Sequence, residues 1–203
     1  MTQMTSRDAG TRRTSPVRER ILAAADEYFY TEGIRAISAD RLIAEAGVSK
    51  VTFYRHFPSK DDLVVAYLEG RAEVERRALE GLRAQAGDAE GTLVAIARSI
   101  AEFTCSPGFR GCPFINAAAE FADPAHPARK VIAAHRAWFA SFVKDLLAEM
   151  GIDDRDVVTD QLIILRDGGM VSGYLSADPD ARADAIIRAG RAVINEARGS
   201  GSR

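Results

Sequence analysis

The stretch SADRLIAEAGVSKVTFYRHFPSK, residues 38–60, decides the fold. It predicts two short helices that are separated by a tight turn. Ser38 and Ser49 are suited to cap the two helices, and Gly47 and Pro58 to end them. Because Gly47 readily adopts the left-handed backbone that a sharp turn between helices needs, the spacing indicates a helix-turn-helix.

The second helix of this motif has two different faces on a helical wheel. Phe53 and Phe57 share one face, which we expect to be buried. The opposite face carries Val51, Thr52 and Arg55, residue types that contact thymine methyl groups and guanine in the major groove. The remaining predicted DNA contacts flank this face: Tyr54, His56 and Lys60 on phosphates, Lys50 at the helix start, and the capping serines Ser38 and Ser49.

The charge of the chain is divided between its two parts. Residues 1–60 have ten Lys and Arg against seven Asp and Glu, a net charge of +3, and residues 61–203 have a net charge of −5. A basic head on an acidic body suits a protein with an anionic partner at one end. The difference is small, and a pair of amphipathic helices joined by glycine also occurs in helical proteins that do not bind DNA.

The rest of the chain also predicts helices, since apolar residues recur at helical spacing and no strand pattern is sustained. The helix after the motif could bend or end at Gly70 or Gly81. We therefore expect an all-α protein of about nine helices, at residues 16–32, 39–46, 50–57, 60–85, 89–104, 113–121, 123–150, 155–176 and 178–198.

These helices are expected to form a three-helix head and a larger body. His126 lies between two prolines at the start of a helix, where we expect it to be exposed. The predicted segments are a disordered N-terminal arm (1–14), a helix-turn-helix DNA-binding domain (15–62), a helical effector-binding and dimerisation domain (63–198) and a flexible tail (199–203).

Composition narrows the function classes. Cys105 and Cys112 are the two cysteines among 203 residues, too few for a disulfide framework, which favours the reducing cytoplasm. We expect no secretory segment and no apolar run of membrane-spanning length. Since we find no Gly-rich phosphate loop, metal-ligand spacing or nucleophile motif, we expect a non-enzyme that uses no metal and no cofactor.

Residues 17–68 resemble the TetR family of bacterial repressors. The resemblance lies in TEGIRAIS (31–38) and IAEAGVSKVTFYRHFPSKDDL (43–63), and more weakly in RGCPFINAAAEF (110–121). Val51 departs from the small residue that many members have, which could narrow the choice of operator. The resemblance implies a homodimer, a palindromic operator, an effector pocket in the body, and release of DNA when the effector binds.

The last two long helices are the predicted dimer interface. The first of them is apolar on several faces, and its glycines would let another helix approach closely. The resemblance also places a four-helix interface here, although both helices could instead pack only within their own subunit. The predicted interface residues are Leu162, Leu165, Gly169, Gly173, Ile186, Ala189 and Val193.

The body predicts an effector pocket, because its helices are rich in aromatic residues that can surround a mainly hydrophobic small molecule. Many of these residues are also needed for an ordinary core. The helix that begins near residue 60 joins this region to the head and is the predicted lever. The predicted lining is Phe103, Phe109, Cys112, Phe114, Asn116, Glu120, His135, Trp138, Phe139, Phe142, Arg166, Met170 and Tyr174.

Other functions are compatible with parts of the sequence. Cys112 lies at a predicted helix start with Arg110 nearby, and both features favour a reactive thiolate. It could sense oxidants or electrophiles with Cys105 as the resolving thiol, or be a small buried packing residue. An enzyme, a DNA-binding protein without an effector, and an activator in place of a repressor are the further alternatives.

Overall fold

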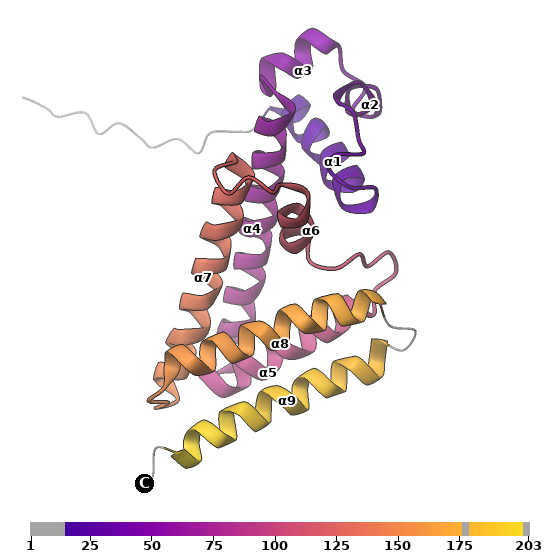
Figure 1. Ribbon diagram of the computed structural model, residues 1–203. Coiled ribbons are helices and arrows are strands. Elements are labelled where there is room, and N and C mark those ends of the chain that lie inside the picture. The colour runs from indigo at the N-terminus through magenta and orange to yellow at the C-terminus, as the bar shows by residue number, and fades with distance from the viewer. Residues whose placement is uncertain (1–14, 176–178, 201–203) are drawn as a thin grey trace, which may run out of the picture.

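The computed structural model describes residues 15–175 and 179–200, which form nine helices (Figure 1). The all-helical prediction is confirmed. The helices are α1 (Pro16–Thr31), α2 (Ala39–Glu45), α3 (Lys50–His56), α4 (Lys60–Ala86), α5 (Ala89–Thr104), α6 (Pro113–Glu120), α7 (Pro127–Glu149), α8 (Arg155–Leu175) and α9 (Pro179–Ser200).

The head consists of α1, α2 and α3, which pack around the start of α4 (Figure 1). Leu42, Phe53 and Leu63 are fully buried there, and Phe29 contributes a ring from α1. Each large apolar side chain removed from water in this way contributes about 1.5–3 kcal/mol. This core fixes the orientation of α3 relative to α4.

The long helix α4 runs without a break from the head into the body. Ser59 and Asp62 form a capping box at its start, in which each side chain accepts a hydrogen bond from the backbone of the other. The helix continues through Gly70 and Gly81, so the break that the sequence allowed at these glycines does not occur. Buried residues at both ends of α4 pack it against head and body, which outweighs the local cost of two glycines.

The body contains α5 to α9. The helices α5, α8 and α9 lie across α4 and α7, at the end of the molecule away from α3 (Figure 1). One core extends from the head along α4 to Phe114 of α6 and Ile132 of α7. A second core lies at the far end, where α7 contributes Leu146 and Leu147. Head and body therefore share the first core, and the boundary at residue 62 stays a prediction.

The start of α7 differs from the prediction, which placed it at Asp123 and Pro124. Asp123 instead accepts the backbone N–H of Ala125 and closes a turn. The helix begins at Pro127, with His126 as its cap. The predicted exposure of His126 is also wrong, because its ring stacks on Phe121 with 4.1 Å between centroids. These local hydrogen bonds compete with the first helical turn.

The C-terminal end also differs from the prediction. The helix α9 continues to Ser200, so the predicted tail at 199–203 begins too early. The predicted arm at residues 1–14 and the last three residues lie outside the described part of the chain. Within the described part, no helix is long and apolar enough to cross a membrane.

Candidate DNA-binding and effector sites

The outer face of α3 is the candidate DNA-binding surface. Ser49 caps the helix by accepting the N–H of Thr52 at 3.2 Å. Phe53 is buried in the core as predicted, and Val51 on the opposite side is 78% exposed. Arg55 is also exposed, and it makes no hydrogen bond or ion pair with the residues that the structure describes. The outward side of α3 thus presents an apolar and a cationic side chain that are free to contact a partner.

The flanks of α3 contain groups that suit phosphates. Tyr54 is exposed and packs its ring edge-on against Phe53. Lys50 forms an ion pair with Asp40 at 3.2 Å between two exposed side chains. Such a pair contributes little to stability, so Lys50 can exchange its partner for a phosphate. His56 is half-buried in the last turn of α3.

Two predicted DNA contacts have other roles in the head. Lys60 donates a hydrogen bond to the carbonyl of Ile34 at 2.6 Å and lies over the ring of Phe29. Burial lowers its pKa. Because its ammonium group points into the head, the prediction that Lys60 contacts phosphate is not supported. Ser38 caps α2 by accepting the N–H of Arg41.

Glu120, a predicted effector-site residue, connects the body to the head. Its carboxylate accepts the backbone N–H of Ile34 at 2.9 Å and that of Arg35 at 2.6 Å. Both N–H groups belong to the segment between α1 and α2. The charge of Glu120 is therefore used inside the protein, at the end of α6, and does not point into an effector pocket.

The loop before α6 makes a second connection to the head. The hydroxyl of Tyr30 donates to the carbonyl of Gly111 at 3.0 Å and accepts the N–H of Arg110 at 2.9 Å. Asn116, another predicted effector-site residue, donates to the carbonyl of Arg110 at 2.7 Å. Movement of α6 or of this loop would therefore be transmitted to the end of α1.

A buried polar cluster joins α4 to three helices of the body, α6, α7 and α8. Arg166 of α8 is 8% exposed and binds Glu75 of α4 at 3.1 Å and Asp167 at 2.9 Å. Nε2 of His135, from α7, lies 3.3 Å from Glu75. Sγ of Cys112, at the start of α6, lies 3.8 Å from the Arg166 guanidinium.

Each carboxylate of this cluster has a cationic partner inside the protein, because Asp167 also pairs with Arg136 at 2.7 Å. Burial alone would raise the pKa of Glu75, but the hydrogen bond from His135 and the charge of Arg166 outweigh it and lower that pKa. Cys112 is 2% exposed, so its thiol is closed to direct attack from solvent in this conformation. The cluster can transmit a displacement of α8 to α4 and α6.

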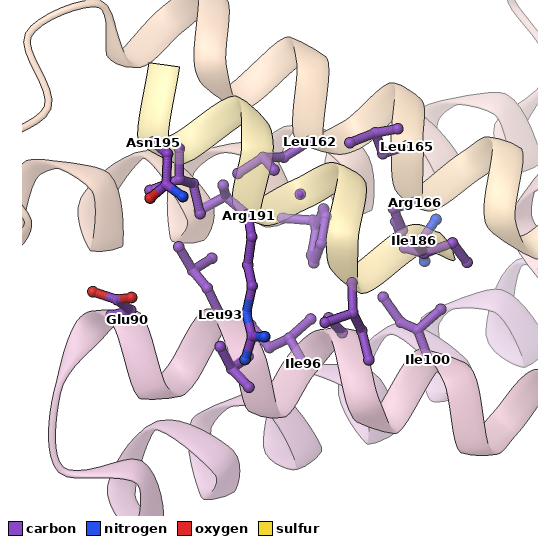
Figure 2. A pocket seen from close by; sticks show the side chains of 17 residues that line it. Glu90, Leu93, Ile96, Ile100, Leu162, Leu165, Arg166, Ile186, Arg191 and Asn195 are labelled. Atoms are coloured by element: carbon purple, nitrogen blue, oxygen red, sulfur yellow. The ribbon is translucent and has the colours of Figure 1, made fainter. Parts of the chain in front are cut away.

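The body contains a cavity of about 90 Å³, partly open to solvent, between α5, α7, α8 and α9 (Figure 2). Two predicted effector-site residues, Phe139 and Arg166, line it. With Phe114 and His135 they also line a smaller cavity of about 10 Å³, space for about one water molecule. The lining of the larger cavity is Glu90, Leu93, Val94, Ile96, Ala97, Ile100, Phe139, Val143, Leu162, Leu165, Arg166, Ile186, Ile187, Gly190, Arg191, Ile194 and Asn195.

The other predicted aromatic residues do not line either cavity. Phe103 packs edge-on against Phe109, and Tyr174 is exposed. Trp138 and Phe142 pack together in the second core, and Met170 belongs to the first. The sequence analysis missed the cavity residues of α5 and α9 because their apolar stripes are indistinguishable from ordinary core.

Gly169 and Gly173 are buried inside the subunit and the other predicted dimer residues are half-buried in it, so the predicted interface stays a prediction. A Cβ atom at Gly169 would collide with Ile186 of α9, and one at Gly173 would lie 2.8 Å from Cβ of Thr104 on α5. These glycines thus allow α9 and α5 of the same chain to pack closely against α8. The other members occupy similar places: Leu162, Leu165 and Ile186 line the cavity, Val193 packs against the second core, and Ala189 is half-buried.

A different face of α8 is exposed and apolar. Val157, Ile164 and Val171 recur every seven residues, Leu175 follows one turn later, and Ile164 is 69% exposed. Side chains at this spacing share one face of a helix. The seven-residue repeat is visible in the sequence, but the apolar residues on the other faces of α8 obscured it.

Comparisons with known proteins match both parts of the chain. A family model described as bacterial regulatory proteins, tetR family, matches residues 21–67. The sequence is 41% identical to that of a TetR-family transcriptional regulator from Streptomyces coelicolor whose crystal structure is known. The two structures superpose with a TM-score of 0.85 over 89% of this chain and 95% of the other.

Two further relatives are regulators by name. The HTH-type transcriptional regulator LmrA of Bacillus subtilis is 28% identical over 141 residues, 68% of this chain and 74% of its own. The HTH-type transcriptional activator FasR of Mycolicibacterium smegmatis is 42% identical over 52 residues, 26% of this chain and 24% of its own. The first likeness extends well beyond the head, whereas the second spans only about a quarter of each chain.

Proposed function

We propose that this chain, which belongs to the TetR family and is a DNA-binding transcriptional regulator, is a homodimeric repressor. It binds a palindromic operator and leaves it when a small, mainly hydrophobic effector occupies the body. The observation that carries this proposal is the outward face of α3, where Val51 and Arg55 project from a helix whose other side is buried.

In this proposal α3 lies in the major groove. Arg55 contacts a guanine, and Val51 and Thr52 contact thymine methyl groups. Tyr54, His56 and Lys50 contact phosphates, which fix the position of the head without selecting a sequence. Such a head acts in the cytoplasm, where the chromosome is.

A single head makes too few contacts for specific binding, and a dimer supplies two heads about 34–36 Å apart, one turn of DNA. We assign the dimer face to the exposed stripe of α8, which contains Val157, Ile164, Val171 and Leu175. Ala185 and Ala192 of α9 are also exposed, and their small side chains would allow close approach of a partner. An apolar stripe of this length on one helix supports an interface, since it gains stability only when covered.

The effector acts through its different affinities for two conformations of the protein. A ligand in the cavity between α5, α7, α8 and α9 contacts Arg166, which holds Glu75 of α4. Displacement of α8 can therefore move α4, the predicted lever. The hydrogen bonds of Glu120 supply a second route to the head, through α6.

Selection of bound duplexes from a random pool tests this function. We expect an enriched palindrome, a dimer by sedimentation at micromolar concentration, and lower transcription from a promoter that contains the palindrome. Higher transcription would identify an activator instead. The proposal fails if the protein sediments as a 22.0 kDa monomer and no duplex is enriched.

Thiol-based sensing through Cys112 remains the alternative on the same scaffold. The contact between its Sγ and Arg166 favours it, and burial of the thiol opposes it. Mass spectrometry after mild peroxide treatment distinguishes the two. An unmodified Cys112 under conditions that alter DNA binding would eliminate the sensor.

A further inference from the structure

The cavity lining is apolar apart from a few residues, and their charges determine what it can hold. Its charged members are Glu90, Arg166 and Arg191. Glu90 forms an ion pair with Arg198 at 2.7 Å, and the carboxylates described above neutralise Arg166. Arg191 makes no hydrogen bond or ion pair within the described part of the chain. The lining therefore has one positive charge that the protein does not compensate.

The position of Arg191 makes this charge available to a ligand. Its side chain extends from α9 toward α5, the helix that carries Leu93 and Ile96 (Figure 2). Ile100 and Ile186 continue the apolar lining toward the end at which Arg166 lies (Figure 2). The cavity thus combines a solvent-exposed cation with a mainly apolar lining.

We infer that this cavity binds an amphipathic carboxylate, whose carboxylate group pairs with Arg191 and whose alkyl chain lies along the apolar residues of α5 and α9. The inference rests on the proposed function, because it names the chemistry of the effector. A guanidinium group presents two parallel N–H donors that match the two oxygens of a carboxylate.

Charge also argues against the other classes of apolar ligand. A neutral hydrophobic molecule would remove water from Arg191 without replacing its hydrogen bonds, which is unfavourable. An alkylammonium ion would add repulsion between like charges to that cost. A carboxylate supplies both the missing hydrogen bonds and the missing negative charge. The volume of about 90 Å³ suits a short alkyl chain.

Calorimetric titration of the full-length protein tests the inference, with octanoate, octan-1-ol and octylamine as probes of equal chain length. We expect octanoate to bind most tightly. Arg191→Met keeps the aliphatic stem and removes the charge, so it should weaken octanoate binding about tenfold to a hundredfold. The same substitution should not weaken octan-1-ol binding, because it removes the cost of desolvating the guanidinium group. Arg191→Lys should retain part of the preference. Arg98→Met, an exposed arginine of α5 outside the lining, is the matched control and should change nothing.

Several results would overturn the inference: octan-1-ol binding as tightly as octanoate, no detectable binding of octanoate, or an Arg191→Met variant with unchanged octanoate affinity. The Ala97→Phe variant, whose added ring fills the cavity, should lose binding of both octanoate and octan-1-ol. Undiminished octanoate binding to this variant would place the site elsewhere and refute the inference.

Operator binding without ligand is measured in parallel. If octanoate fails to bind but the protein still binds its operator, only the inferred ligand chemistry is wrong. If the protein does not bind an operator at all, the proposed function itself is refuted.

Discussion

Replacement of Glu120 by Gln tests the connection between body and head. The Glu120 carboxylate accepts two backbone N–H bonds, from Ile34 at 2.9 Å and Arg35 at 2.6 Å. A hydrogen bond to a charged group contributes about 1.5–3 kcal/mol. The amide of Gln keeps one acceptor oxygen and loses the charge. Because the site is partly exposed, we expect a loss below that range, about 1 kcal/mol.

Two measurements check this prediction. Urea denaturation should show a free energy of unfolding that is about 1 kcal/mol lower in Glu120→Gln than in the unaltered protein. Hydrogen exchange of the Ile34 and Arg35 amides should become roughly fivefold faster, the factor that corresponds to that energy. Glu69→Gln, an exposed carboxylate of α4, is the control and should alter neither. Unchanged exchange at Ile34 and Arg35 would refute the reasoning that Glu120 holds the head.

Three other predictions follow from the same contacts. Ile164→Asp should convert the dimer to a 22.0 kDa monomer in sedimentation while Val74→Asp, at another exposed apolar position, does not; a persistent dimer would contradict the assigned face. The lowered pKa of Glu75 means that its stabilisation is present above its unfolded value, about 4.3, and is lost as the pH falls through the folded value. The difference in urea midpoint between Glu75→Gln and the unaltered protein should therefore shrink on acidification, and a constant difference would be inconsistent with that shift. Gly173→Ala should lower the free energy of unfolding by about 1–3 kcal/mol because its Cβ meets Thr104, whereas Gly70→Ala, in open space, should raise it by up to about 1 kcal/mol; equal effects would contradict the packing of α8 on α5.

The parts of the fold that depend on local chemistry were predictable from the sequence. Ser38 and Ser49 cap α2 and α3 as their positions indicated, and Phe53 is buried while Val51 is exposed. Caps and helical periodicity act over a few residues, so a sequence window contains all the information that they need. The start of α7 was mispredicted because the turn at Asp123 involves competing local hydrogen bonds.

The parts that depend on distant contacts were not predictable in this way. Glu120 and Asn116 looked like pocket residues, but their partners lie in the head and in the loop before α6. Gly169 and Gly173 correctly predicted that another helix approaches α8 closely. The sequence alone could not distinguish a helix of the same chain from a helix of a partner. Apolar faces of α5, α8 and α9 are alike in sequence, and only their packing separates core, cavity and exposed stripe.

The most direct test of the central claim is the affinity of the unaltered protein and of Arg55→Ala for every single-base variant of the selected operator. If α3 lies in the major groove with Arg55 on a guanine, the substitution should cost about 1–3 kcal/mol and abolish the preference at one symmetric position in each half-site. A uniform loss over all positions would instead make Arg55 a phosphate contact. An affinity that Arg55→Ala leaves unchanged for every duplex would contradict the assignment of this face of α3 to DNA.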